Sequence, residues 1–208
     1  MVSISSFSLE YDRKKEYFSI KTEEVVFCPQ CGGRLRYRDS VLRNVKNLLS
    51  EAMRFLLRRL KCQACGKLHR ELPNTICPYK HYEADVIQAV IDGSEEASSC
   101  SADDSTIRRW KSGFAGAEPD IIQRLSSVYA RMAGKTVPIT ATEDILGKIR
   151  DSEKRWFPFV MGLLINNGHE TCTEFAFFPP PKSARVGGAT KTVAERSREN
   201  DKTTQDTG

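Results

Sequence analysis

Two Cys-x-x-Cys-Gly motifs constrain this chain more than any other feature of its sequence. The first runs from Cys28 to Gly32 and the second from Cys62 to Gly66. Two such motifs match the spacing of a tetrahedral four-thiolate metal site, in which each motif supplies two sulfurs from a tight turn. A glycine directly after each motif suits a backbone that needs a positive φ. We therefore predict one metal site, with the ligands Cys28, Cys31, Cys62 and Cys65.

The metal expected first at this site is Zn²⁺, with iron second, because thiolate is a soft ligand. A thioredoxin-like redox motif would need one Cys-x-x-Cys in a βαβ context, not two motifs. Structural disulfides would need an export signal. The stretch between the motifs, residues 32–61, is longer than the ~15–20 residues usual for such sites. Four thiolates leave no open coordination position, so we expect a structural site and no enzyme activity.

The composition allows one domain or two small ones in 208 residues. The start, Met1-Val2-Ser3, has no basic residues and no apolar run, so no secretory signal is predicted. The longest apolar run, around Trp156–Ile165, is far short of the ~20 residues that span a bilayer. Seven cysteines without an export signal indicate a reducing, cytoplasmic location and no membrane partner.

Positive charge is concentrated around the two motifs. Residues 34–70 contain eleven Lys or Arg against two acids, so this segment carries +9 while the whole chain carries +5. A localised basic segment is typical of a protein that binds a polyanion, most often nucleic acid. The alternative is a solvated surface without a partner. We expect Arg58, Arg59 and Arg70 to contact DNA phosphates.

The segment around the motifs predicts a small β zinc ribbon over residues 25–73, preceded by an N-terminal segment, residues 1–24. Residues 34–38 alternate strictly between charged and other side chains, as in a half-buried strand. Short strands are expected at Tyr17–Ile20 and at Val25–Phe27.

The return limb of the ribbon, residues 53–61, is ambiguous. Apolar residues with helical spacing lead into it and run through it, namely Val41, Val45, Leu48, Ala52, Leu56 and Leu60. A ribbon instead needs an antiparallel strand that runs directly into Cys62. We favour a strand from about Met53, with a turn or short helix over residues 42–52.

A helix-turn-helix is predicted over residues 78–116. Its first helix runs from about Tyr79 to Asp92, and Gly93 is placed as the C-terminal stop. Ser101–Asp104 resembles a capping box with Asp in place of the usual Glu. A second short helix is expected over residues 105–114.

The second helix separates its residues by type. Ile107, Trp110 and Phe114 share one face, and the opposite face carries Ser105, Arg108, Arg109 and Ser112. Residues 83–104 carry acidic side chains and no Lys or Arg, whereas residues 105–114 carry basic side chains and no acidic ones. A helix with a docked apolar side and a basic outer side suits insertion into the major groove, with arginines directed at guanine edges or phosphates. These four outer residues are our candidate DNA contacts.

A C-terminal helical region is predicted over residues 117–178. Pro119 suits the first position of a helix that ends near Gly134. Its apolar stripe indicates core or a partner-binding face and consists of Ile121, Ile122, Leu125, Val128, Tyr129 and Met132. A short helix is expected over residues 142–150 and a last, largely apolar helix over residues 152–167.

A disordered tail is predicted over residues 179–208. It begins with three consecutive prolines, and its only large apolar residues are Val186 and Val193. Such a segment buries too little apolar surface to offset the entropy lost on ordering.

The three remaining cysteines are read as free thiols. Cys77 and His81 are four residues apart and would be able to share a metal on one helical face, but Pro78 between them indicates an element boundary. Cys100 and Cys172 are expected to be small, unreactive apolar residues.

Several local motifs of this chain occur together in one family of proteins. They are Cys28-Pro29-x-Cys31-Gly32-Gly33, Arg38-Asp39-Ser40, Arg58-Arg59-Leu60-Lys61-Cys62-x-x-Cys65-Gly66, Leu68-His69-Arg70-Glu71-Leu72-Pro73, Pro78-Tyr79-Lys80-His81-Tyr82 and Ser105-Thr106-Ile107-Arg108-Arg109-Trp110. With them the chain resembles an uncharacterised bacterial family that has a zinc ribbon followed by a helix-turn-helix. That family is similar to the N-terminal DNA-binding region of insertion-sequence transposases.

The resemblance covers about residues 25–115 and implies DNA binding in mobile elements or their domesticated descendants. It implies no known activity. The catalytic domain of such transposases is an RNase H-like fold that holds divalent metal with three spaced carboxylates. Residues 115–208 are short and helical in pattern, so we expect no active recombinase on this chain.

The sequence thus predicts an α+β protein: a small β zinc ribbon, a mostly α-helical region that contains a helix-turn-helix, and a disordered tail. The expected function is binding of double-stranded DNA, as a transposase-derived accessory factor or transcriptional regulator. The alternative is a protein–protein interaction module without sequence-specific DNA binding. A protein partner or self-association through the C-terminal helices is also expected. RNA binding is less favoured, because no aromatic-rich strand offers base stacking.

Overall fold

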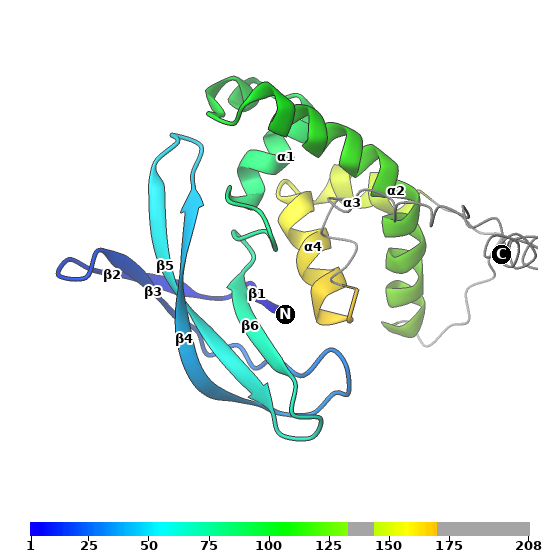
Figure 1. The fold of residues 1–208 in the computed structure, drawn as a ribbon. Helices are drawn as coiled ribbons and strands as arrows, with labels where there is room; N and C mark the ends of the chain where they lie inside the picture. Colours follow the sequence, from blue (N-terminus) through cyan, green and yellow to red (C-terminus); the bar gives the residue numbers. More distant parts are fainter. Residues whose placement is uncertain (133–143, 170–208) are drawn as a thin grey trace, which may run out of the picture. The chain divides into compact units, whose positions relative to one another are not determined.

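The fold is known from a computed structural model, which describes residues 1–132 and 144–169. These residues belong to the first of two units of the chain, Met1–Ala176. Within them, a curled six-stranded sheet comes first and a group of helices follows (Figure 1). This confirms the predicted α+β class. The predicted tail, residues 179–208, lies outside the described residues.

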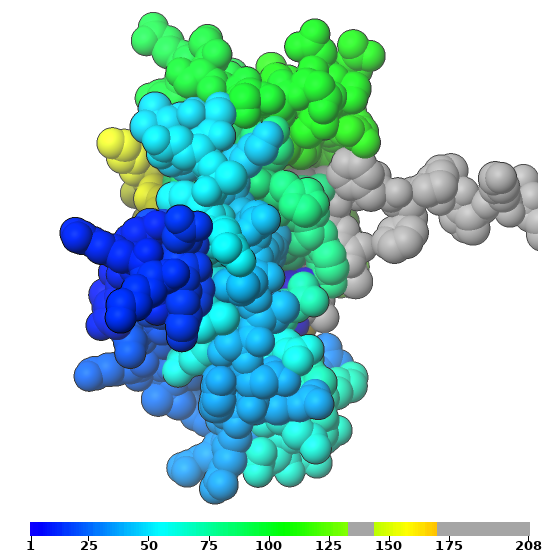
Figure 2. All heavy atoms as spheres, turned by 60° about the vertical axis from the view of Figure 1, so that its left-hand side comes forward, coloured from blue at the N-terminus to red at the C-terminus, as the bar shows by residue number. Residues whose placement is uncertain are grey.

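The sheet is organised around β5, which ends at Cys62. β5 pairs antiparallel with β4 along nearly its whole length, parallel with β3 near its start, and antiparallel with β6 near its end. β1 joins β6 in parallel, and β2 joins β3 antiparallel. Figure 2 shows the β2–β3 hairpin, in dark blue, beside the longer β4–β5 hairpin. The strands are Val2–Ile4 (β1), Ser8–Asp12 (β2), Tyr17–Lys21 (β3), Leu35–Lys46 (β4), Ala52–Cys62 (β5) and Leu68–Pro73 (β6).

The return limb of the predicted ribbon is a strand, as favoured, but the preceding segment is more extended than expected. Residues 42–46 continue β4, and only the turn at residues 47–51 separates it from β5. Val45 lies opposite Met53 in the ladder and is 1% exposed. The helical spacing of the apolar residues does not decide the structure here, because burial of Val45 in the sheet outweighs it. Local preferences for helix or strand are routinely overridden by tertiary packing.

The N-terminal segment, residues 1–24, forms part of the same sheet. Ile4 on β1 and Ile20 on β3 are buried in the core that covers β5. β3 confirms the strand expected at Tyr17–Ile20, whereas the strand expected at Val25–Phe27 is reduced to one isolated bridge at Phe27. The sequence pattern alone did not reveal these pairings because β1 and β6 are far apart in the chain.

The helices follow β6 in the order α1, η1, α2, α3 and α4. α1 begins later than expected, but it ends at Gly93 as predicted, where φ is +66°. α3 and α4 lie within about four residues of the bounds expected for the two C-terminal helices. Their bounds are Ala84–Asp92 (α1), Glu95–Ser99 (η1, a short 3₁₀ helix), Asp104–Met132 (α2), Ile145–Ser152 (α3) and Trp156–Asn166 (α4).

The prediction of two separate helices over residues 105–114 and from Pro119 onward is wrong, because α2 is one helix that passes through Pro119. Buried side chains on both sides of the proline, such as Phe114 and Ile121, pack into the same core. Their burial offsets the hydrogen bond that proline lacks. Figure 1 shows α2 bending midway along its length, as expected for a helix with an internal proline.

The connection between α1 and α2 also departs from a helix-turn-helix. It spans residues 93–103 and contains η1, whereas that motif joins its helices by a turn of three or four residues. The start of α2 is capped by Asp103, whose carboxylate accepts a hydrogen bond from the Thr106 N–H at 2.8 Å, and not by Ser101. The Ser105 hydroxyl and the Thr106 N–H lower the pKa of Asp103 to about 2. The strict helix-turn-helix geometry is therefore absent from residues 78–116.

The helices share a core that is rich in aromatic rings. The centroid of Trp110 lies 5.1 Å from that of Tyr82, and Phe114 lies 5.5 Å from Trp156. The Arg150 guanidinium lies over the Trp156 ring at 4.2 Å. α4 contacts β1 as well, so it joins the helical core to the sheet. Among the described residues, no helix combines the length and the apolar character needed to cross a membrane.

We predict that Trp110→Ala lowers the free energy of unfolding by about 3–5 kcal/mol, because Trp110 is 2% exposed and its removal leaves a cavity in the helical core. Leu49→Ala is the control, since Leu49 is 76% exposed and its loss should change stability by less than about 0.5 kcal/mol. Urea denaturation measures both values. Equal, small effects of the two variants would contradict the packing described here.

Candidate metal centre and basic face

The four predicted ligand cysteines come together at the end of the sheet. Their sulfurs all lie within 4.8 Å of one another. The Sγ atoms of Cys28 and Cys65 are 3.7 Å apart, and those of Cys31 and Cys62 are 3.5 Å apart. A tetrahedral metal with metal–sulfur bonds of about 2.3 Å needs sulfurs separated by about 3.8 Å. The cluster therefore fits one four-coordinate metal ion.

Matching turns present the two cysteine pairs. Gly32 N–H donates to the Cys28 carbonyl at 2.8 Å, and Gly66 N–H donates to the Cys62 carbonyl at 3.1 Å. Both glycines have positive φ, +69° and +73°, which side chains other than glycine adopt with strain. The glycine after each Cys-x-x-Cys pair, which helped to predict the site, is therefore needed for the backbone conformation of its turn.

Gly33 is a third required glycine, and its role depends on the second cysteine turn, not on the motif that contains it. A Cβ at this position would lie 2.9 Å from the Cβ of Ala64 and 3.0 Å from the sulfur of Cys62. The backbone of one turn thus approaches the other turn too closely for any side chain. Only the doubled glycine after Cys31 hinted at this contact in the sequence.

The sulfurs have unequal proton affinities. Backbone N–H groups of Cys65 and Ala64 help to lower the pKa of Cys62 to about 6. For Cys31 the Gly33 N–H lowers the pKa, but the neighbouring thiols outweigh it and raise the pKa to about 12. Several negative sulfurs at this spacing repel one another strongly. A bound cation would offset this repulsion and favour deprotonation of all four thiols.

His69 on β6 extends the site beyond the four sulfurs. Its Nε2 lies 3.3 Å from the sulfur of Cys28, and the side chain is buried. An imidazole N–H that donates to a thiolate orients the ligand and stabilises its negative charge. The contact between His69 and Cys28 was not predicted from the sequence. It depends on the pairing of β6 with β5, and no sequence motif indicates this pairing.

The other described cysteines do not take part. Cys77 is buried, and burial raises its pKa to about 12, as expected of an inert thiol. Cys100 is half-buried. Within residues 1–132 and 144–169, the four motif cysteines form the cluster of metal-binding side chains, and Cys77 and His81 form none. Cys172 lies outside the described residues.

Basic side chains meet on one face of the sheet where β4, β5 and β6 run side by side. Arg36 lies opposite Lys61, while Arg59 lies opposite Asp39 on β4 and Arg70 on β6. These pairs form two cross-strand rows, one through Lys61 and one through Arg59. Arg59 and Lys61 are two residues apart on β5, so the side chains of both rows point to the same side of the sheet. We call this surface the basic face; it consists of Arg36, Asp39, Arg59, Lys61, Leu68 and Arg70.

Arg58 and Arg59 are each engaged with a carboxylate. Both nitrogens of the Arg58 fork bond to Glu71, at 2.5 and 2.7 Å, and Glu71 is 2% exposed. Arg59 makes the same two-pronged contact with Asp39, which lowers the pKa of that carboxyl group. A phosphate contact by either arginine would therefore compete with an existing ion pair. Arg70 is exposed on the basic face.

The candidate contacts on α2 lie on its outer side, opposite the buried Trp110. The Arg109 guanidinium donates to the Ser105 carbonyl at 3.2 Å and to the Thr106 hydroxyl at 2.9 Å. The four predicted DNA contacts of this helix are all exposed, namely Ser105, Arg108, Arg109 and Ser112. Their contact with DNA stays a prediction.

We predict that Gly33→Ala lowers the affinity of the site for Zn²⁺ by about tenfold or more, because the new methyl group pushes the two turns apart. Gly116→Ala is the matched control. Gly116 lies in α2, and a Cβ there meets nothing within 4 Å, so stability should rise by about 0.5–1 kcal/mol. A competition titration with a chelating dye measures the affinity. Unchanged Zn²⁺ affinity in Gly33→Ala would show that the turns do not need this contact.

Comparison with known proteins bears on this same region. A family model described as a domain of unknown function (DUF6431) matches residues 28–110. That segment begins at the first ligand cysteine, contains the metal centre and the basic face, and ends at Trp110. No curated protein and no solved structure matches the chain. The chain is thus similar over this segment to a family without an assigned function, and the resemblance to transposase DNA-binding regions gains no support from these comparisons.

Proposed function

We propose that this chain is a nucleic-acid-binding protein in which Zn²⁺ on four thiolates holds the sheet together and the basic face contacts double-stranded DNA. The observation that carries the proposal is the cross-strand placement of like charges beside the metal centre. Arg36 opposes Lys61, and Arg59 opposes Arg70, with Asp39 as the one acid in the two rows.

Like charges directly opposite one another destabilise a sheet. Such an arrangement is tolerated when a polyanion supplies the compensating charge, as phosphates do on DNA. No aromatic side chain lies in these two rows, so the face offers no platform for stacking single-stranded bases. The chemistry therefore favours phosphate contacts to a duplex.

Zinc is favoured at the metal centre because four soft thiolates at tetrahedral spacing suit it. Iron is the second candidate for the same ligands. All four positions are filled by sulfur, so the metal would have a structural role and the protein no enzyme activity at this site. The role in the cell would be that of a regulator or of an accessory factor derived from a transposase.

The outer side of α2 is proposed as a second contact surface. Arg108 and Lys111 are exposed there, while Arg109 is bonded within its own helix. We expect Arg108 and Arg109 to contact base edges only if α2 enters the major groove. The connection from α1 is longer than in a helix-turn-helix, so base contacts by α2 need a test separate from phosphate contacts by the basic face.

The competing proposal is a protein–protein interaction module whose ribbon and Ile121–Met132 stripe on α2 bind protein partners. Burial weighs against the helical part of this alternative. Ile121, Leu125 and Val128 are fully buried, and most of α4 is buried as well. Met132 is exposed, but a single apolar side chain on a surface is ordinary.

The proposal predicts that Arg36→Ala, Lys61→Ala and Arg70→Ala each weaken binding to any duplex and lower the salt slope of binding by about one unit. Lys14→Ala on the β2–β3 turn is the matched control, because it removes the same charge from an exposed site outside the basic face. Binding titrations at several salt concentrations give the slopes.

Arg58→Ala is unsuitable for this test, since it would leave Glu71 buried without its partner and cost about 3 kcal/mol of stability. If the three basic-face variants bind like Lys14→Ala, the basic face is not the DNA-binding surface. If a bound duplex is instead lost only in Arg108→Ala, α2 carries the contact.

A further inference from the structure

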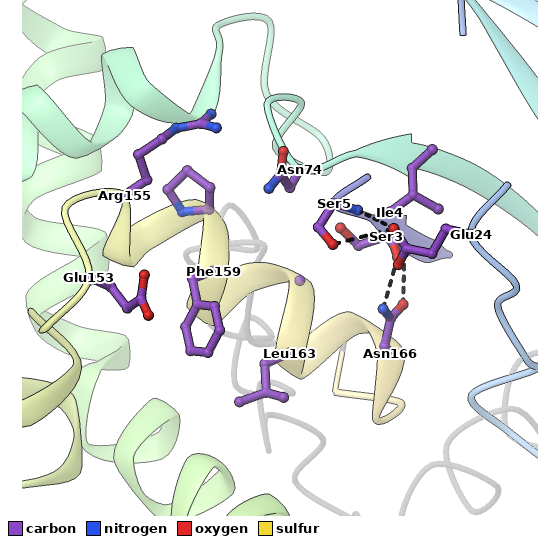
Figure 3. A pocket seen from close by; sticks show the side chains of 12 residues that line it. Ser3, Ile4, Ser5, Glu24, Asn74, Glu153, Arg155, Phe159, Leu163 and Asn166 are labelled. Atoms are coloured by element: carbon purple, nitrogen blue, oxygen red, sulfur yellow. Dashed lines mark hydrogen bonds between the residues drawn. The ribbon is translucent and has the colours of Figure 1, made fainter. Parts of the chain in front are cut away.

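A cavity of about 390 Å³ lies between β1 and α4, and none of its lining residues belongs to the metal centre or to the basic face. Figure 3 shows the cavity with Ser3, Ser5 and Asn74 on the side of the sheet and with Phe159 and Leu163 on α4. Apart from Asn74, these residues also lie outside the segment that matches the family model. The cavity is thus a feature of its own.

Hydrogen bonds hold the sheet side of the cavity in place. The Asn166 side-chain amide at the end of α4 bonds both to the backbone N–H and to the carbonyl of Ser3, each at 2.8 Å. The Glu24 carboxylate accepts the N–H groups of Ser5 and Ser6 at 2.7 and 2.8 Å. These hydrogen bonds fix the backbone on the sheet side, so this side of the cavity is preformed, as is usual for small-molecule sites.

Polar groups face the cavity without being used by the protein. Ser3 is 5% exposed, and its hydroxyl lies 3.2 Å from the position that a Cβ on Gly162 would take. The hydroxyl makes no hydrogen bond within the part of the chain that the structure describes. The same holds there for the side chains of Asn74 and Glu153. The Ser3 hydroxyl, open to the cavity and not bonded within the protein, is available to a ligand that enters there.

The charge of the cavity is negative. Glu24 and Glu153 line it, and Arg155 is the one cation in its lining. Both Arg155 nitrogens that bond are directed to Asp85, at 2.7 and 2.8 Å, so this positive charge is already compensated. The two glutamates therefore set the sign of the potential that a ligand meets.

The α4 side of the cavity is apolar. Phe159 is 40% exposed, and it lies with Pro158 and Leu163 along one stripe of the helix. Phe159 lies beside the carboxylate of Glu153 in Figure 3, and this pair suits a cation with an apolar body, because the ring attracts positive charge and buries methylene groups.

From this combination we infer that the cavity binds a small organic cation, an ammonium or amidinium group carried on a short apolar body. The cation would pair with Glu153, and its apolar part would lie on Phe159, which is drawn beside Glu153 in Figure 3. The volume is at the lower end of the range found for ligand sites, which matches a ligand of this size.

The test titrates the full-length, ¹⁵N-labelled protein with 2-phenylethylamine and, separately, with 3-phenylpropanoate, which has a similar body and the opposite charge. The amine should shift the amide signals of Ser3, Ser5, Asn74 and Gly162 and saturate in the millimolar range or below. The carboxylate should leave them unchanged.

Glu153→Gln removes one charge without breaking any hydrogen bond of its side chain and should weaken amine binding about three- to fivefold, the effect of one exposed ion pair. Glu95→Gln, an exposed glutamate on η1, is the control and should bind like the unchanged protein. Phe159→Ala should weaken binding further. Equal binding of both probes, shifts confined to other residues, or no saturation by the amine would each overturn the proposal.

Discussion

The gathering of four cysteine sulfurs within 4.8 Å of one another is the constraint that ties the strands of the sheet together at one end. The cysteines belong to the loop before β4, the end of β5 and the turn into β6, so the position of each of these strands is tied to the cluster. A dication on four thiolates would offset the repulsion among their negative charges, and in small metal domains the energy of metal binding is energy of folding. The basic face is built on the same three strands, which links its geometry to the cysteine cluster.

The metal centre is also connected to the helices. Gly168, directly after α4, has a φ of +81°, and a Cβ there would lie 3.0 Å from the carbonyl oxygen of Pro29 inside the first cysteine turn. Asn166, two residues earlier, bonds to β1. The end of α4 thus packs against both the first cysteine turn and β1 at the edge of the sheet. A displacement of either the turn or β1 would therefore displace α4, which belongs to the helical core.

Local features of the site were predictable from the sequence, and long-range ones were not. The cysteine pairs follow from their spacing and from turns that need glycine, and the strand into Cys62 follows from the ribbon that these pairs require, against a helical spacing of the apolar residues. The pairing of β1 with β6, the burial of Glu71 against Arg58 and the contact of His69 with Cys28 depend on residues far apart in the chain. The break expected at Pro119 failed for the same reason, because burial of Phe114 and Ile121 in one core keeps α2 continuous.

The central claim is that one metal ion sits on four thiolates. X-ray absorption at the zinc edge of the purified, reduced protein tests it most directly. We expect one equivalent of zinc, surrounded by four sulfurs at about 2.3 Å with no lighter ligand. Folded protein without bound metal, or a metal with oxygen or nitrogen in its first shell, would contradict it.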